Sequence, residues 1–230
     1  MRSVSIVLPA RNEAGNIAAC VAGALSVLDA LGLHGEVIVV DDGSSDGTAE
    51  AAASTDLRVR VVRKGPPHGY GAALRAGFGV ANGSLVFFTD ADLQFDIGEL
   101  GRLLALAGED VVVAGFRAPR RDPARRRALG WAWSRFAGVV LGLRVRDLNC
   151  AFKLFPRALV TDPPLESDGA FVNAELLARA SARGFTVREV PVSHHPRRSG
   201  EASGARPDVA LRAVCDLLRL RGDVRRGRQR

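Results

Sequence analysis

Short apolar runs rich in β-branched residues alternate along the first half of the chain with longer segments rich in alanine. Strands that are apolar at successive positions are typical of a parallel sheet covered by helices on both faces. The alternation therefore predicts an α/β fold, with a mostly parallel central sheet flanked by helices in a single domain. The predicted strands are Val4–Pro9, Glu36–Asp41, Leu57–Val62, Ser84–Thr89 and Asp110–Gly115, and the predicted helices are Ala14–Leu31, Thr48–Ser54, Gly71–Ala81 and Ile97–Ala107.

The regular alternation ends after Gly115, where a segment rich in arginine and proline begins. Beyond it, the pattern predicts helices at Leu129–Leu143 and Asn173–Arg183 and strand-like runs at Cys150–Phe155 and Thr186–His195. We expect one domain over residues 1–206, followed over residues 207–230 by an amphipathic helix and a basic, disordered tail.

Composition allows one sizeable core, because 47% of the 230 residues are apolar. The three cysteines, Cys20, Cys150 and Cys215, are odd in number and far apart, which argues against a disulfide framework or a zinc site and favours a reducing compartment. No signal-peptide pattern and no apolar run of the roughly 20 residues that a spanning helix needs is present. We expect a cytoplasmic protein that does not cross a membrane.

Positive charge is in excess, with 32 Lys and Arg against 25 Asp and Glu, and arginines gather between residues 117 and 127 and again between 219 and 230. Such clusters favour an anionic partner, either nucleic acid, a phospholipid surface or a phosphorylated substrate. Nucleic acid is the least favoured of these. Aromatic residues are only 6% of the chain, no known binding motif is present, and acidic strand ends would repel a phosphate backbone.

The segments that follow the first, second and fourth predicted strands are unusually polar: PARNE, DDGSSDGT and DADLQ. Ligands of open α/β sheets bind beyond the carboxyl ends of the strands. Acidic loops repel a diphosphate, but they hold one through a divalent cation. The oxygens of Asp90, Asp92 and Gln94 suit Mg²⁺ or Mn²⁺. The alternative is that Asp90 and Asp92 cap the helix predicted to begin near Ile97.

Six segments taken in order, SIVLPARNEAGNI, EVIVVDDGSSDGT, GYGAALRAGF, FFTDADLQFD, RVRDLNCAFKLF and REVPVSHHPRRSGEAS, resemble the inverting family 2 glycosyltransferases of the GT-A fold. The likeness is to the branch of polyprenyl-phosphate (dolichol-phosphate) mannose or glucose synthases, and it runs from about Ser3 to Ser203. It implies that a hexose passes from a nucleotide sugar of the GDP-mannose or UDP-glucose type to a polyprenyl phosphate at the cytoplasmic face of a membrane, with Mg²⁺ or Mn²⁺ as cofactor.

The resemblance also implies roles for individual residues. It assigns donor binding to Pro9, Arg11, Glu13, Asp41, Asp42, Gly69, Gly71, Arg75, Asp90, Ala91 and Asp92, and the metal to Asp90, Asp92 and Gln94. It assigns the acceptor or the diphosphate to Arg117, Arg126, Arg197, Arg198 and Ser199, and catalysis to Asp92, Arg117 and Asp147. Gly130 stands where relatives commonly carry a serine, so the resemblance leaves the further acceptor contacts open among Arg121, Arg125, Arg126 and Arg127.

A phosphate acceptor is already ionised near neutral pH, so Asp147 is expected to orient the acceptor or the sugar rather than to act as a strong base. The alternative acceptor is a saccharide or small-molecule hydroxyl, for which a carboxylate base is needed. One of His194 and His195 completes the metal shell, or both are simply packed or exposed. Asp46 is expected to cap a helix, and Glu175 to lie near the acceptor loop or to pair with Arg179.

Membrane contact is expected through the apolar face of residues 129–143, the arginines before it and a helix over Pro207–Leu220, an arrangement that suits peripheral binding to anionic lipid. The alternative is that these apolar faces close the core and that the arginines are solvated. A membrane protein that receives the product is a possible partner.

Overall fold

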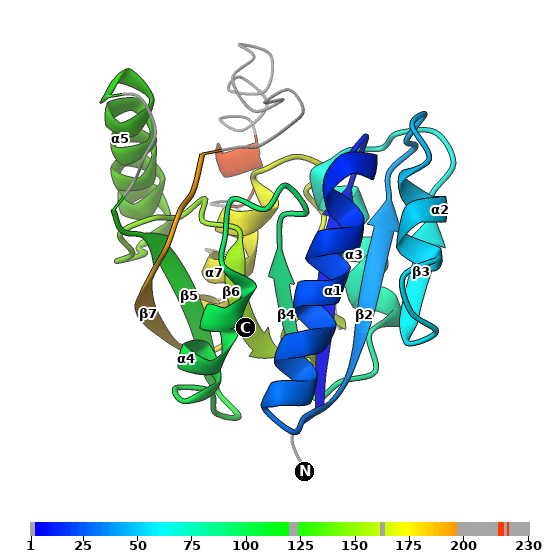
Figure 1. Cartoon of the computed structure of the whole chain (residues 1–230). Helices are drawn as coiled ribbons and strands as arrows, with labels where there is room; N and C mark the ends of the chain where they lie inside the picture. The colour runs from blue at the N-terminus through cyan, green and yellow to red at the C-terminus, as the bar shows by residue number, and fades with distance from the viewer. Residues whose placement is uncertain (1–2, 120–123, 162–163, 197–215, 219, 221–230) are drawn as a thin grey trace.

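A seven-stranded sheet with helices on both faces forms the centre of the molecule (Figure 1). The computed structural model describes residues 3–119, 124–161, 164–196, 216–218 and 220. The strands are β1 (Ser3–Ala10), β2 (His34–Asp41), β3 (Val59–Arg63), β4 (Leu85–Thr89), β5 (Val111–Arg117), β6 (Phe152–Pro156) and β7 (Thr186–Val192). The helices are α1 (Ala14–Ala30), α2 (Thr48–Ala53), α3 (Tyr70–Val80), η1 (Ile97–Glu99), α4 (Leu100–Leu104), α5 (Ala124–Leu141), α6 (Ala158–Thr161) and α7 (Val172–Ala182).

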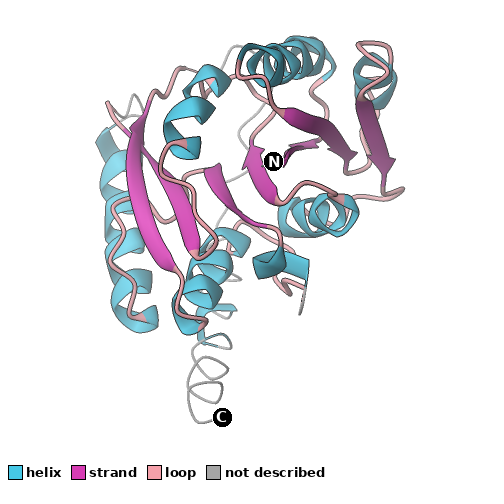
Figure 2. Ribbon diagram, turned by 90° about the horizontal axis from the view of Figure 1, so that it is seen from below, coloured by secondary structure: helices cyan, strands magenta, loops and turns pink. Residues whose placement is uncertain are grey.

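The order of the strands across the sheet is β3-β2-β1-β4-β6-β5-β7, and every neighbouring pair except those made by β6 is parallel. β6 runs antiparallel to both β4 and β5. Figure 2, seen from below, shows the twist of the sheet between its helical layers. The predicted α/β class and the mostly parallel sheet are confirmed. Because β6 is reversed, it begins at the edge where its neighbours end.

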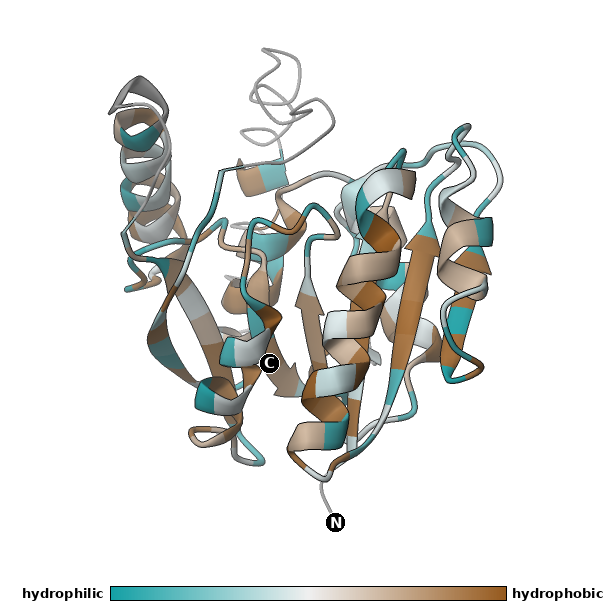
Figure 3. Ribbon diagram, viewed as in Figure 1, coloured by the Kyte–Doolittle hydropathy of each residue, from teal (hydrophilic) through white to brown (hydrophobic). Residues whose placement is uncertain are grey.

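Two apolar layers cover the sheet, because successive side chains of a strand point to opposite faces. Ile6 and Leu8 of β1 belong to the same buried cluster as Ile17 of α1. Val7, between them, belongs to the opposite cluster with Phe78 of α3. β2 and β4 are accordingly coloured apolar along most of their length in Figure 3, whereas the edge strands β3 and β7 also carry hydrophilic positions. Each such buried side chain contributes about 1.5–3 kcal/mol relative to its exposed state.

Two predicted helices differ from the observed ones. Residues 97–107, expected as one helix, form the 3-10 turn η1 and the short α4. The helix predicted from Leu129 begins instead at Ala124, because the intervening arginines are good helix formers. The predicted C-terminal helix falls mainly outside the described residues. Among those described, no helix is both long and apolar enough to span a membrane.

Candidate active site

The loops after β1 and β2 are tied to each other at the carboxyl edge of the sheet. The amide of Asn12 donates to Ser44 Oγ at 2.9 Å, and the Asn12 side-chain oxygen accepts from the amide of Ser45 at 2.9 Å. Asn12 has φ 55°, a left-handed conformation that asparagine tolerates better than most residues. Of the predicted donor residues at this edge, Pro9 is buried and Arg11 is exposed.

Asp46 links the starts of α1 and α2. Its carboxylate accepts from the amide of Ala14 at 3.0 Å and from the amide of Thr48 at 3.1 Å, so it binds the first amide of each helix, although the N-cap residue of α2 is Gly47. Burial would raise the pKa of Asp46, but the hydrogen bonds from Thr48 and Ala14 outweigh it and lower the pKa. The buried Glu13 accepts from Asn16 Nδ2 at 2.7 Å. The predicted donor residue Glu13 is thus fixed before any ligand binds.

The two aspartates at the end of β2 are both buried and both bind backbone amides. Asp41 Oδ1 accepts from Ser44 at 3.0 Å. Asp42 accepts from His68 at 2.9 Å and from Gly69 at 2.8 Å. Asp42 therefore holds the segment that leads into α3, where further predicted donor residues lie.

Gly71 and Arg75 of α3 face residues 164–169, which we call the pre-α7 loop. The amide of Gly71 donates to the carbonyl of Asp168 at 2.7 Å, and a Cβ at Gly71 would lie 2.0 Å from the carbonyl oxygen of Ser167. Arg75 pairs with the Asp168 carboxylate and also donates to the carbonyl of Ser167 at 3.2 Å. The close approach of two backbones is what requires glycine at this position.

The buried carboxylate of Glu175, on α7, binds the backbone of the pre-α7 loop. Its two carboxylate oxygens accept from the amides of Glu166 and Ser167, each at 2.8 Å. Arg179 lies one turn further along and pairs with the same carboxylate at 3.2 Å. The expected pair with Arg179 is confirmed, and the carboxylate also orders the loop against α3.

The aspartates after β4 lie at the centre of the edge. Asp92 is buried and Asp90 is half-buried. Leu93, the next residue, has φ 58°, a strained conformation for a leucine of the kind that clusters at functional sites. Asp92 Oδ1 accepts from the amide of Gln94 at 3.1 Å. Asp96, and neither of the other two aspartates, caps η1 by accepting from the amide of Gly98, so the capping alternative is wrong.

The pKa values of two nearby groups, the Cys20 thiol and the Tyr70 hydroxyl, are raised in part by the negative charge of these carboxylates. Burial first, and then the charges of Asp92, Asp90 and Glu13, together raise the pKa of Cys20 to about 12. The buried hydroxyl of Tyr70 also has a raised pKa, through burial first and then through the charge of Asp90. A sheet edge with this negative charge and with carboxylate oxygens suits a hard divalent cation.

Gln94 connects the β4 loop with the segment after β7. Its side-chain amide donates to the carbonyl of His195 at 3.0 Å, and the amide of His195 donates back to the Gln94 carbonyl at 2.7 Å. His194 is buried with its ring 5.4 Å from that of Phe95, while His195 is exposed. Within the part of the chain that the structure describes, no group of three or more His, Cys, Asp or Glu side chains gathers to hold a metal ion.

On the other side of Asp90, the predicted acceptor residues Arg117 and Asp147 come together. Arg117 Nε donates to Asp147 Oδ2 at 2.6 Å and Arg117 Nη2 donates to Asp147 Oδ1 at 2.9 Å. Only 12% of the arginine side chain and 8% of the aspartate side chain are exposed. A bidentate pair of this kind is strong and directional. The sequence predicted both residues at the site but not that they bind each other.

Residues 144–151, the pre-β6 loop, carry Asp147 and are anchored from four elements. The amide of Arg146 donates to Glu189 of β7 at 2.7 Å, and the amide of Leu148 donates to Ser134 Oγ of α5 at 3.4 Å. Arg117 of β5 provides the third anchor, and Lys153 of β6 provides the fourth. Sequence reasoning missed Lys153, although a single lysine in the apolar run CAFKLF was a visible signal.

Some predicted residues are not placed by the structure. Arg197, Arg198 and Ser199 lie outside the described residues, as do Arg121 and the side chains of Arg125 and Arg126. Their predicted contacts with the acceptor or the diphosphate remain predictions.

Comparison with known proteins identifies the family of this chain and several of its relatives. The model of the family described as glycosyl transferase family 2 matches residues 5–166. The low-salt glycan biosynthesis hexosyltransferase Agl6 of Haloferax volcanii is 30% identical over 209 residues, 87% of this chain and 49% of that protein. The undecaprenyl-phosphate 4-deoxy-4-formamido-L-arabinose transferase of Salmonella paratyphi B is 30% identical over 207 residues, 88% of this chain and 62% of that protein. The chain thus spans between about half and three-fifths of these relatives.

Solved structures resemble nearly the whole chain. Glucosyl-3-phosphoglycerate synthase from Mycobacterium tuberculosis, in complex with Mn²⁺, uridine diphosphate and phosphoglyceric acid, matches with a TM-score of 0.73 and 26% identity over 96% of this chain and 79% of that one. Mannosyl-3-phosphoglycerate synthase from Rubrobacter xylanophilus matches with the same TM-score and 24% identity over 96% and 75%. With the family model covering most of the sheet, the chain belongs to glycosyltransferase family 2 and has its GT-A fold.

Proposed function

We propose that this protein transfers a hexose from a nucleotide sugar to a polyprenyl phosphate, with Mg²⁺ or Mn²⁺ as cofactor and with inversion at the anomeric carbon. The donor lies over the loops after β1, β2 and β4. The acceptor phosphate lies beside Arg117. The named relative that uses undecaprenyl phosphate supports this acceptor class, and the Mn²⁺ complex of the solved neighbour supports the cofactor.

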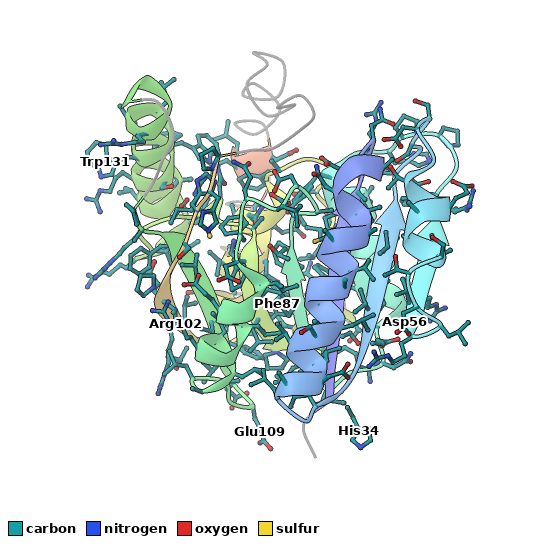
Figure 4. The ribbon with its side chains drawn as sticks, in the orientation of Figure 1. His34, Asp56, Phe87, Arg102, Glu109 and Trp131 are labelled. Atoms are coloured by element: carbon teal, nitrogen blue, oxygen red, sulfur yellow. The ribbon has the colours of Figure 1, made fainter. Side chains whose placement is uncertain are left out.

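The observation that carries the lipid acceptor is the position of α5. On its inner face, Ser134 Oγ accepts a hydrogen bond from the amide of Leu148 in the pre-β6 loop, the residue after Asp147. Its outer face exposes four large apolar side chains, and Trp131 extends away from the body of the molecule (Figure 4). They are Leu129, Trp131, Phe136 and Val139, with exposed fractions between 53% and 74%. A buried arginine–aspartate pair beside an exposed apolar helix fits an acceptor whose phosphate carries a lipid chain.

The donor side fits a nucleoside diphosphate bound through a cation. Asp90 and Asp92 offer oxygen ligands, and Gln94 is the proposed third ligand. Pro9, Arg11, Glu13, Asp41 and Asp42 surround the nucleoside in this proposal, and Gly71, Arg75 and Ala91 complete the donor side. The bound cation would offset the charge that develops on the leaving diphosphate.

The reaction forms one bond and breaks one. An oxygen of the acceptor phosphate attacks the anomeric carbon, and the bond from that carbon to the diphosphate breaks with its electron pair leaving on the diphosphate. Arg117 holds the acceptor so that two anions meet in line, which is a matter of positioning and charge neutralisation. Asp147 orients the acceptor, because a phosphate oxygen has no proton to lose near neutral pH.

The test is a transfer assay with Mn²⁺ or Mg²⁺, a panel of labelled sugar nucleotides and a short polyprenyl phosphate, with Asp92→Ala as the control. Label that enters the organic phase from one donor, and that Asp92→Ala abolishes, supports the proposal and identifies the sugar. The solved neighbour with phosphoglyceric acid points to a second acceptor class, a small phosphorylated hydroxyl compound. Label in an aqueous product with 3-phosphoglycerate, and none in lipid, would favour that class.

The apolar face of α5 gives a second, independent test. We expect the protein to co-sediment with vesicles of anionic phospholipid, and Trp131→Ser together with Val139→Ser to weaken this binding without a loss of stability, since both side chains are exposed. The matched control is Leu57→Ser, which removes a fully exposed leucine before β3. Equal vesicle binding by wild type and the α5 variant would contradict the docking role.

A further inference from the structure

Lys153 is the most deeply buried charge-bearing group near the candidate site. Its side chain is fully buried in the middle of β6, between strands whose side chains are otherwise mainly apolar. Its ammonium donates to the carbonyl of Leu148 at 3.2 Å, to the carbonyl of Cys150 and to Asn173 Oδ1 at 2.7 Å. All three protons of the ammonium are therefore used within the protein.

Burial of this ammonium is costly and needs a reason. A buried cation is tolerated only where hydrogen bonds and opposite charges compensate its lost hydration. Burial lowers the pKa of Lys153 to about 8, while the charge of Asp147 acts in the opposite direction. An apolar side chain would pair equally well in β6, next to Phe152 and Leu154. The lysine is therefore explained by the two carbonyls that it binds rather than by the sheet.

Those carbonyls belong to the pre-β6 loop and lie on the C-terminal side of Asp147. The amide of Cys150 also donates to the carbonyl of Asp147 at 3.3 Å, which closes a tight turn around the ammonium. We infer that Lys153 is a positioning residue, which fixes the turn after Asp147 and so places the Asp147 carboxylate against Arg117 for the acceptor. This inference rests on the proposed function for the identity of the acceptor.

The third hydrogen bond links Lys153 in the sheet to the helix packed on that face. Asn173 lies on α7, and the buried hydroxyl of Tyr70 lies near both Asn173 and Asp90. Lys153 thus stands between the turn that carries Asp147 and the side chains behind Asp90. Its loss would disturb the acceptor side directly and the donor side only through Asn173.

The test compares Lys153→Met with Lys153→Arg by amide hydrogen exchange. Methionine keeps the approximate length of the side chain but removes its charge and its hydrogen-bond donors, whereas arginine keeps the charge and the donors. In Lys153→Met, peptides covering residues 144–151 should exchange at least about tenfold faster, because two buried carbonyls lose their donor. Lys153→Arg should restore much of the protection. The matched control is Lys64→Met, which removes a lysine that binds the carbonyl of Ala72 and should leave exchange at 144–151 unchanged.

Ligand measurements separate a positioning role from general damage. In Lys153→Met, affinity for UDP or GDP with Mn²⁺ should stay within about threefold of wild type, while kcat/KM for the acceptor falls about 100-fold, the typical result of a shift of about 1 Å in a reacting group. Wild-type exchange at 144–151, or an equal loss of nucleotide affinity, would overturn the inference. If Lys153→Met does not fold, hydrogen exchange of the wild type decides: exchange of the Cys150 amide at the rate of an unstructured peptide overturns the inference, because this amide closes the turn after Asp147.

Failure of the proposed function gives a different pattern. If wild type transfers no sugar to any acceptor, the proposed reaction fails, while hydrogen exchange and nucleotide binding still report on Lys153.

Discussion

The buried pair of Arg117 and Asp147 makes a quantitative prediction for Asp147→Asn. Asparagine keeps the shape of the side chain but removes its charge, and its NH₂ group would face a guanidinium N–H instead of accepting from it. Removing one partner of a buried pair costs about 3–5 kcal/mol. We expect the lower end, about 3 kcal/mol, because 12% and 8% of the two side chains remain exposed. For a chain of this size that is a fall in Tm of roughly 6–12 °C.

The matched control is Asp168→Asn. Asp168 also pairs with an arginine, Arg75, but 67% of the aspartate side chain is exposed. An exposed pair contributes about 0–1 kcal/mol, so the same substitution should change Tm by no more than about 4 °C. Calorimetry or chemical denaturation of wild type and both variants measures the difference directly.

An added anion tests whether the Arg117 site accepts phosphate. In Asp147→Asn the guanidinium has lost its carboxylate, so inorganic phosphate should raise the Tm of this variant more than that of wild type or Asp168→Asn. A Tm for Asp147→Asn equal to that of Asp168→Asn would refute the buried pair. A phosphate response equal in all three proteins would refute the anion site.

Two further predictions follow from other features of the site edge. Gly71→Ala should destabilise the protein by about 1–3 kcal/mol, because the new Cβ would meet the Ser167 carbonyl oxygen. In the same helix, the Cβ of Gly79→Ala would meet nothing within 4 Å, so this variant should be more stable by up to about 1 kcal/mol. Equal effects of the two variants on the free energy of unfolding would contradict this prediction. Cys20 and Cys150 have pKa values raised by burial to about 12 from 9.0, so each contributes stability that is present below pH 9 and is lost as pH rises toward 12. Unfolding of wild type and of the Cys20→Ala/Cys150→Ala variant between pH 8 and 11 should therefore differ in slope by up to about 1.4 kcal/mol per pH unit for each cysteine; parallel curves would refute it.

Periodicity predicted the strands of the parallel part of the sheet closely, because each is an apolar run followed by polar residues. It predicted β1 as Val4–Pro9, and the strand is Ser3–Ala10. The strand ends also brought Asp41, Asp42, Asp90 and Asp92 to one edge, as expected from their positions. These are local properties of the sequence, so they can be inferred from it.

Properties that depend on contacts distant in sequence were not predictable in this way. The antiparallel pairing of β6 depends on where α5 returns the chain, and the sequence pattern does not give that direction. The pair of Arg117 and Asp147 joins residues 30 positions apart. Lys153 was not singled out within the predicted strand-like run Cys150–Phe155, because two of its partners are backbone carbonyls, which carry no signature in the sequence.

The reversed direction of β6 has a consequence for how members of such a family diverge. Residues 118–151 leave the sheet at the end of β5 and re-enter it at the start of β6, at the same edge, so this segment begins and ends beside the proposed acceptor site at Arg117 and Asp147. Its length and composition can change while the register of β4, β5 and β6 stays as it is. We expect exchange of this segment between homologues to transfer acceptor preference and to leave the choice of nucleotide unchanged. The range of acceptors would then change through this one segment, independently of the rest of the fold.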